Sequence, residues 1–339
     1  MKYIQITVLL LMLMSALGAT KYAGEIFSFS PGVANQAMGG TGLSFTASPA
    51  AGWWNPALLA ADSPAGIELM RSEHFEGLLS QNQLSVSFGN AVSLNINHLA
   101  IDKIKLTKLE NEDEALSNDN RPYVWKTVTN QDLILSASFA RPLSERIFVG
   151  ISPKIAYRDL AQHSGYGFGA DLGALWISGE LLSTGLNLKD FFNGDFGRKP
   201  LHFKGLSMGL NLRDFFGTQI LWESGEHEIA LPNLDLEASY GFELLKYEIP
   251  VLLAVRAQAF PEERGEASNL SSKGLSADLH AGLMLQIIPQ LSLMTGYDVD
   301  SFTAGLGLNI KSLGINYAFK AKAYDSLGYT QKISLGYSW

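Results

Sequence analysis

The stretch QLSLMTGYDVDSFTAGLGLNIKSLGINYAFKAKAYDSLGYTQKISLGYSW, from Gln290 to Trp339, decides the fold of this chain. In its last segment every second side chain is apolar: Ile333, Leu335, Tyr337 and Trp339. The residues between them are small or polar: Lys332, Ser334, Gly336 and Ser338. Because successive side chains of a strand point to opposite faces, this alternation predicts a strand with one apolar and one polar face. The whole stretch contains four such segments separated by short turns.

A sheet of such strands suits either a soluble sandwich or a membrane barrel. The polar faces consist mainly of Gly, Ser, Thr and Asn, which fit a wet interior. We therefore expect a barrel that this stretch closes. Tyr337 and Trp339 are the candidate closing residues, with Trp339 at the membrane interface, where aromatic side chains are enriched.

The composition narrows the class of protein. The chain has 339 residues, of which 17% are charged, and a formal net charge of −8. Soluble domains usually contain about 25% charged residues. No basic patch stands out, which argues against a nucleic-acid partner. The absence of cysteine excludes disulfides, thiolate metal sites and a lipid-anchored lipoprotein.

Residues 1–19 have the pattern of a cleaved secretory signal peptide. Lys2 precedes an apolar run over 8–13, and small residues follow it up to Ala19. The run is shorter than the roughly 20 apolar residues that a spanning helix needs. An exported chain of this kind is a periplasmic or secreted β protein, or an outer-membrane barrel.

Alternation continues through residues 65–339 and predicts an all-β, antiparallel transmembrane barrel of about 14 strands, the even number typical of such barrels. One of the strands is expected at 180–191, and a separate hairpin at 203–222 would raise the count to about 16. The connections also sort by length, as they do in outer-membrane barrels. Short turns are expected at 89–90, 142–145, 178–179, 245–248, 289 and 311–312. Long loops are expected at 102–131, 192–232 and 261–274.

The segment GLNLKDFF at 185–192 recurs as GLNLRDFF at 209–216. Strands of one barrel share a pattern, so the repeat indicates a duplicated strand end. A duplicated binding element is the alternative.

Residues 20–64 do not read as barrel strands. They are rich in Gly, Ala, Ser and Pro and contain AMGGTG at 37–42 and GWWNPALLA at 52–60. No lysine follows the glycines, so a phosphate-binding loop is excluded. We expect a plug or hatch segment packed against the inside or rim of the barrel. Its motif residues are Met38, Gly39, Gly40, Trp53, Trp54, Asn55 and Pro56.

This segment also carries a resemblance. Ala37-Met38-Gly39-Gly40 and Trp54-Asn55-Pro56-Ala57 are similar to the N-terminal signature of the PorV/PorQ family, within the FadL-like group of outer-membrane barrels. The segments 316–319, 327–330 and 332–336 resemble that family's closing hairpin. The resemblance implies a cargo-handling or shuttle role in type IX secretion, with secreted cargo proteins or secretion machinery as partners. The alternative is a FadL-like transporter of hydrophobic small molecules such as fatty acids, with the N-terminal segment as a hatch.

Charged residues of both signs fall on the polar faces. The lumen-facing candidates are Lys154, Arg158, Asp171, Glu237, Arg256, Asp278 and His280. Because charges at low dielectric need partners, we expect them to pair across the lumen and hold the barrel and plug together. A polar pathway is the alternative.

Enzyme chemistry is not indicated. The six histidines do not stand at metal-ligand spacing, and no histidine has a serine and an acidic partner at the spacing of a catalytic triad. The acidic run at 110–114 lacks the glycine and spacing of a calcium loop, and we interpret it as a solvated loop. We therefore predict no catalytic residues, no metal and no cofactor.

Overall fold

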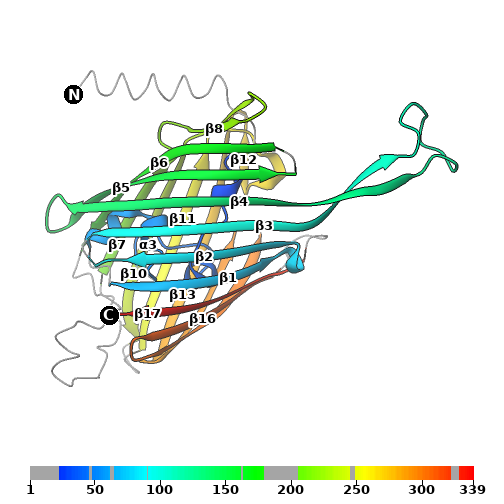
Figure 1. Cartoon of the computed structure of the whole chain (residues 1–339). Helices are drawn as coiled ribbons and strands as arrows, with labels where there is room; N and C mark the ends of the chain where they lie inside the picture. Colours follow the sequence, from blue (N-terminus) through cyan, green and yellow to red (C-terminus); the bar gives the residue numbers. More distant parts are fainter. Residues whose placement is uncertain are drawn as a thin grey trace, which may run out of the picture.

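The computed structural model describes residues 23–45, 48–61, 65–89, 91–161, 163–178, 205–244, 249–321 and 328–339. These residues form a closed antiparallel barrel with a small N-terminal segment inside it (Figure 1). The expected signal peptide and the strand expected at 180–191 lie outside the described residues.

Fourteen strands of the described residues make the wall. In order around the barrel they are β1 (Gly66–His74), β2 (Leu79–Ser87), β3 (Val92–Leu109), β4 (Pro122–Pro142), β5 (Ile147–Leu160), β6 (His163–Ile177), β7 (Gly205–Arg213), β10 (Asn233–Leu244), β11 (Ile249–Phe260), β13 (Leu275–Ile288), β14 (Leu291–Asp298), β15 (Ser301–Ile310), β16 (Leu313–Lys320) and β17 (Thr330–Ser338). Strand β17 pairs with β1 and closes the ring. The predicted all-β barrel of about 14 strands is confirmed.

The hairpin of β8 (Thr218–Trp222) and β9 (His227–Ala230) does not add to this count. Strand β8 pairs with residues 165–168 of β6, where β7 has already ended, and so continues the line of β7. The third short strand, β12 (Leu270–Ser272), pairs with the start of β13. The hairpin expected at 203–222 therefore contributes a single wall position.

Two sequence predictions about connections are wrong. The loop expected at 192–232 contains the wall strand β7, which pairs with β6 on one side and with β10 on the other. The turn expected at 178–179 lies only partly within the described residues. The loop expected at 102–131 is mostly strand, since β3 continues to Leu109 and β4 begins at Pro122. This β3–β4 arm projects beyond the rest of the barrel (Figure 1). We call the end with the arm the loop end, and the opposite end, where β17 finishes, the turn end.

The outer and inner faces of the wall differ as the alternation predicts. Along β13, Leu275, Leu279 and Leu283 face outward, whereas Asp278 and His280 are buried on the inner face. An apolar outer face fits the hydrocarbon of a bilayer. No helix of the described residues is long and apolar enough to cross a membrane.

The closing seam contains the two expected residues. The rings of Tyr337 and Trp339 stack with centroids 6.3 Å apart on the outer face at the turn end. The backbone N–H of Trp339 donates to the Ala65 carbonyl at 3.2 Å, which ties the end of β17 to the residue before β1.

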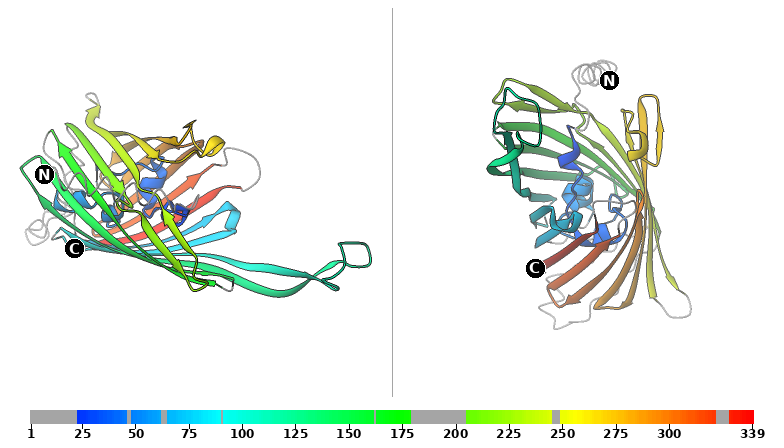
Figure 2. Two further views of the ribbon diagram at one scale, coloured as in Figure 1. Left: turned by 90° about the horizontal axis from the view of Figure 1, so that it is seen from above. Right: turned by 90° about the vertical axis from the view of Figure 1, so that its right-hand side faces the viewer.

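The N-terminal segment, residues 23–61 as described, lies inside the ring of strands (Figure 2). It contains only short helices: η1 (Glu25–Phe27), α2 (Val33–Ala37), α3 (Ala51–Trp54) and η2 (Pro56–Ala60). Two more short helices, η3 (Phe75–Gly77) and η4 (Gly265–Ala267), lie in loops. The apolar core forms between this segment and the wall. Met38 packs with Leu252 and Met294, and Trp53 packs with Leu99 and Ile134.

Candidate functional site

The carboxylate of Glu237, on the inner face of β10, binds the backbone of the N-terminal segment. It accepts hydrogen bonds from the N–H groups of Gly42, Leu43 and Ser44 at 2.7, 2.9 and 2.9 Å. The hydroxyl of Ser44 donates a fourth bond at 2.7 Å. These donors belong to a turn with no helical or strand partners of its own. A single wall side chain therefore satisfies three consecutive N–H groups that would otherwise be buried without partners.

Gly39 and Gly40 hold the segment close to the neighbouring part of the wall, strands β11, β13 and β14. Both have positive φ values, 69° and 78°, which favour glycine. A Cβ at Gly39 would collide with the backbone of Tyr297. The Nη1 atom of Arg256 donates to the Gly40 carbonyl at 2.7 Å, and Nδ1 of His280 hydrogen-bonds the Gly39 carbonyl at 3.1 Å. The glycine pair thus allows backbone contact between the segment and the wall.

Trp54 and Asn55 join the two parts of the segment to each other and to the wall. The indole N–H of Trp54 donates to the Pro31 carbonyl at 2.9 Å, and the Asn211 amide of β7 donates to the Trp54 carbonyl at 2.7 Å. The Asn55 amide donates to the Ala174 carbonyl of β6 at 3.0 Å. The Asn55 side chain also caps η2, in which Pro56 is the first residue, because Asn55 Oδ1 accepts from the N–H of Ala57.

Lys154 and Arg158, both on β5, form ion pairs within the lumen. Lys154 lies 2.8 Å from Asp171 and 2.7 Å from Asp214, and Arg158 lies 2.7 Å from Asp132. Asp214 stands in the turn after β7 and is buried beside β6. The lysine is thus shared between two carboxylates.

A second ion cluster surrounds Asp235 of β10. Its two carboxylate oxygens bind Arg213 at 2.6 Å and Arg256 at 2.9 Å. The guanidinium of Arg256 also lies over the ring of Trp54, 5.5 Å from the ring centroid. Arg256 therefore contacts the wall cluster and the N-terminal segment together.

Asp298, at the end of β14, is the centre of a third cluster. It lies 3.0 Å from His280 and 2.8 Å from Lys320. Gln36, on α2, donates to the same carboxylate at 3.1 Å. This cluster again includes a contact from the N-terminal segment.

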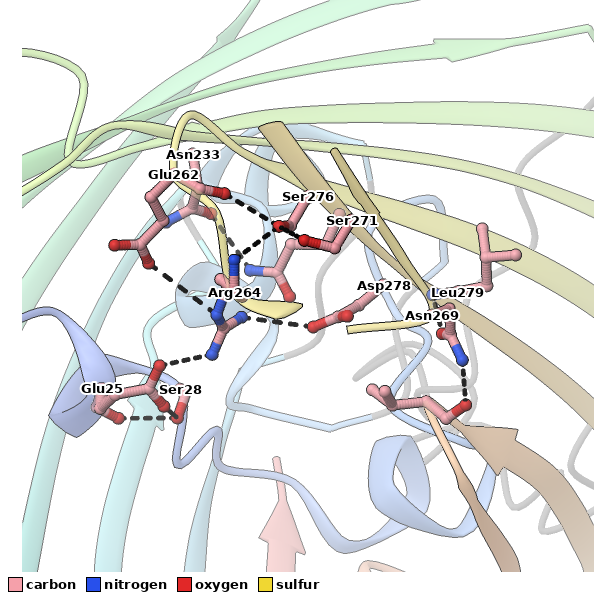
Figure 3. A network of polar contacts seen from close by, with 12 residues as sticks. Glu25, Ser28, Asn233, Glu262, Arg264, Asn269, Ser271, Ser276, Asp278 and Leu279 are labelled. Atoms are coloured by element: carbon pink, nitrogen blue, oxygen red, sulfur yellow. Dashed lines mark hydrogen bonds and ion pairs between the residues drawn. The ribbon is translucent and has the colours of Figure 1, made fainter. Parts of the chain in front are cut away.

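Arg264, in the loop between β11 and β12, makes the outermost set of contacts (Figure 3). Its guanidinium lies 3.3 Å from Asp278 on the wall and 2.5 Å from Glu25 on the N-terminal segment. It also lies 3.8 Å from Glu262 and 4.1 Å from the centroid of the Phe260 ring. One loop side chain thus connects the loop, the wall and the N-terminal segment.

A cavity of about 510 Å³ opens between the N-terminal segment and the loop end of the wall. Its apolar lining includes the aromatic side chains Phe27, Phe29, Trp54, Phe75 and Phe260. Its cationic lining consists of Arg213, Arg256, Arg264, Lys320 and Lys332, interspersed with carboxylates. The cavity is therefore amphipathic and suits a ligand with an apolar body and one polar group.

The backbone pairing of strands β4 and β5 is interrupted beside the N-terminal segment. The β4–β5 ladder runs to the pair Ser136–Lys154 and resumes at Phe139–Ile151. Pro153 lies in the gap and has no N–H to donate. Behind it, the hydroxyl of Ser138 donates to the Gly52 carbonyl of α3 at 3.0 Å. The backbone ladder between β4 and β5 is therefore interrupted here, and the hydroxyls of Ser138 and Ser152 hydrogen-bond across the gap at 2.7 Å.

All of the lumen-facing residues expected from the sequence lie on the inner face, although they belong to separate clusters. Sequence reasoning missed several partners at strand ends and in turns: Arg213, Asp214, Arg264, Asp298 and Lys320. Their signal was weak because alternation does not apply at the ends of strands. Among the described residues, no group of three or more His, Asp or Glu side chains is arranged to hold a metal ion.

Two solved structures share the architecture. The toluene transporter TbuX of Ralstonia pickettii aligns with a TM-score of 0.53 at 13% identity, covering 91% of this chain and 98% of that chain. The toluene transporter TodX of P. putida aligns with a TM-score of 0.50 at 10% identity, covering 91% of this chain and 99% of that chain. The chain thus shares the barrel fold of these two proteins. No protein-family model and no curated protein matches the chain, so the PorV/PorQ resemblance stays a prediction.

Proposed function

We propose that this protein is an outer-membrane conduit for hydrophobic small molecules, with residues 20–64 as a hatch inside the barrel. The observation that carries the proposal is the amphipathic cavity above the N-terminal segment. Aromatic side chains offer apolar surface to a ligand, and the nearby cations offer partners to an acidic group such as the carboxylate of a fatty acid. The fold shared with two toluene transporters supports the same class of cargo.

In this proposal the lumen below the cavity is closed at rest. Wall side chains bind the hatch backbone at Gly40, Gly42 and Gly52. Passage then requires the hatch to shift or the ligand to leave sideways. The lapse in pairing at Pro153 lies next to α3 and is the best-placed side exit.

Filling the cavity tests the proposal. Ser28 lines it, and Ser28→Trp places an indole in the space. We expect uptake of radiolabelled fatty acid or toluene by a deletion strain carrying this variant to fall several-fold below the wild-type level. Glu145→Trp, in the exposed turn at the other end of the barrel, is the matched control and should leave uptake unchanged. Equal uptake by both variants, with equal amounts of folded barrel, would refute a role for the cavity.

A second candidate, the handling of secreted proteins, is favoured by the β3–β4 arm. The arm stands free of the barrel and exposes large apolar side chains: Leu116, Tyr123, Val124 and Trp125. An exposed hairpin of this kind offers both side chains and unpaired strand edges to a protein partner. No ligand cavity is needed for this role.

Replacing residues 102–129 by a short turn separates the two functions. If the arm binds cargo, the shortened barrel should fold and keep its fatty-acid uptake while secreted proteins accumulate in the periplasm. The readout is the secreted proteome by mass spectrometry. An unchanged secreted proteome would eliminate cargo handling by the arm and leave the conduit as the function.

A further inference from the structure

The outer face of the wall carries an unexpected row of polar side chains. On β1, Met70 and Ser72 are buried on the inner face, so Arg71 and Glu73 face outward. The side chain of Arg71 is 49% exposed. A charged side chain that faces the hydrocarbon of a bilayer destabilises a barrel. We therefore expect this row to bind a polar group of its surroundings.

The row continues across neighbouring strands from β17 to β5. Register places Gln331 beside Glu73, Asn82 beside Arg71 and His98 beside Asn82. Four hydrogen bonds link members of the row: Gln331 to Glu73 at 3.2 Å, Arg71 to Asn82 at 2.9 Å, His98 to Gln131 at 3.4 Å and Gln131 to Asp159 at 3.5 Å. The row is thus an ordered feature of the wall.

The apolar belt is correspondingly short on this side of the barrel. On β1 only Ile67 and Leu69 precede Arg71 on the outer face, counted from the turn end. On β13, every outward position from Leu275 to Ile287 is apolar. Bilayer hydrocarbon that covers β13 would therefore meet charged groups on β1.

An apolar groove of about 610 Å³ lies beside the polar row on the same outer face. Its apolar lining comes from five neighbouring strands: Leu69, Leu84, Ile96, Ile315, Ile333 and Leu335. Arg71, Asn82 and His98 also line it and lie two residues closer to the loop end. The groove is thus apolar along most of its length and carries the positive charge of Arg71 at the end that points toward the loop end of the barrel.

We propose that this groove binds a phosphate-bearing lipid of the surrounding membrane. An acyl chain lies along the apolar lining, and the phosphate accepts hydrogen bonds from Arg71 and His98. The planar guanidinium suits a phosphate, since it can donate two parallel N–H bonds. Arg71 lines the groove, Asn82 takes one of its guanidinium N–H groups, and Glu73 lies 3.9 Å away and accepts from Gln331. A guanidinium has five N–H groups, so Arg71 can also donate to a phosphate in the groove. The phosphate headgroup of this lipid lies nearer to the middle of the membrane than the headgroups of lipids beside β13. There it provides hydrogen-bond acceptors for the polar row.

Native mass spectrometry of the full-length barrel in detergent tests this site, with dioleoyl phosphatidylglycerol as the probe. Arg71→Gln keeps a polar side chain and removes the charge, and the double variant with His98→Gln removes both donors to phosphate. We expect the tightest lipid adduct to weaken about tenfold in Arg71→Gln, the size of a lost charged hydrogen bond. Arg71→Lys should restore part of the affinity.

Lys105→Gln is the matched control, because Lys105 is an exposed cation on the arm away from the groove. It should bind phosphatidylglycerol as the wild type does. Equal binding by Arg71→Gln, or equal binding of dioleoylglycerol, which lacks the phosphate, would overturn the proposal. A wild-type protein that appears in the mass spectrum as a dimer without bound lipid would also overturn the proposal, because a second copy of the chain would then cover the groove. Heat-dependent gel migration confirms that each variant is folded.

Discussion

Glu237→Ala should free the N-terminal segment from the wall while leaving the barrel closed. The substitution removes the acceptor for three backbone N–H groups and the Ser44 hydroxyl. Each buried donor left without a partner costs roughly 1–3 kcal/mol, so the turn at 42–44 loses several kcal/mol of docking energy. Wall pairing between β10 and its neighbours does not involve this side chain.

Single-channel conductance in planar bilayers measures the effect. The wild-type barrel should conduct little, and Glu237→Ala should open frequently to a larger conductance. Glu228→Ala is the control, because Glu228 is a carboxylate on β9 whose nearest cation is Arg158, 4.0 Å away on the wall. If Glu237→Ala conducts as little as Glu228→Ala, the segment does not block the lumen.

The barrel itself follows from the sequence because its signal is redundant. Each strand repeats the same alternation, as in β17 and β13, and one face must be apolar for lipid. An error in one strand does not change the class of fold. This is why the predicted count of about 14 strands is correct although the wall strand β7 falls within the loop expected at 192–232.

The misplaced elements have a common physical cause. Residues 103–106, Lys-Ile-Lys-Leu, alternate as in a strand, and the register shifts between Leu106 and Thr107. Residues 103–109 include three lysines, which are unusual in a strand that faces lipid. Charges are excluded from strands only where lipid covers them, and the arm stands outside the membrane belt. In the same way, the two copies of the GLNL repeat have equal strand propensity. Pairing with β6 and β10, which selects Gly209–Leu212 for the wall, is a long-range effect.

The partners of the lumen residues were harder to predict than the residues themselves. The alternation of polar and apolar residues identified Lys154 and Glu237. The partner of Lys154 is Asp214, which lies in a turn. The partners of Glu237 are backbone N–H groups of residues 42–44. Backbone groups carry no sequence signal. The glycines at 39 and 40 gave the one hint that backbone, and not side chains, would meet the wall.

Trp54→Ala is expected to have the largest effect on the N-terminal segment. Trp54 is 3% exposed, donates to the Pro31 carbonyl and lies under the guanidinium of Arg256. Loss of a buried tryptophan costs on the order of 3–5 kcal/mol through transfer energy and the cavity left behind. Met38 and Trp53 also anchor the segment, but Trp54 alone combines a buried ring with the Pro31 hydrogen bond and the Arg256 contact. We therefore expect the segment to loosen from the wall while the barrel strands stay paired.

Limited proteolysis of the protein reconstituted in liposomes, read by mass spectrometry, measures this release. Residues 23–61 should be protected in the wild type and cleaved at least tenfold faster in Trp54→Ala, since about 1.4 kcal/mol already corresponds to a factor of ten. Trp125→Ala makes the same change on the exposed arm and should leave the segment protected. Equal protection in both variants would show that Trp54 is not an anchor. Complete cleavage in the wild type would mean that the segment is not docked in the lumen, and the N-terminus would then be an arm outside the barrel.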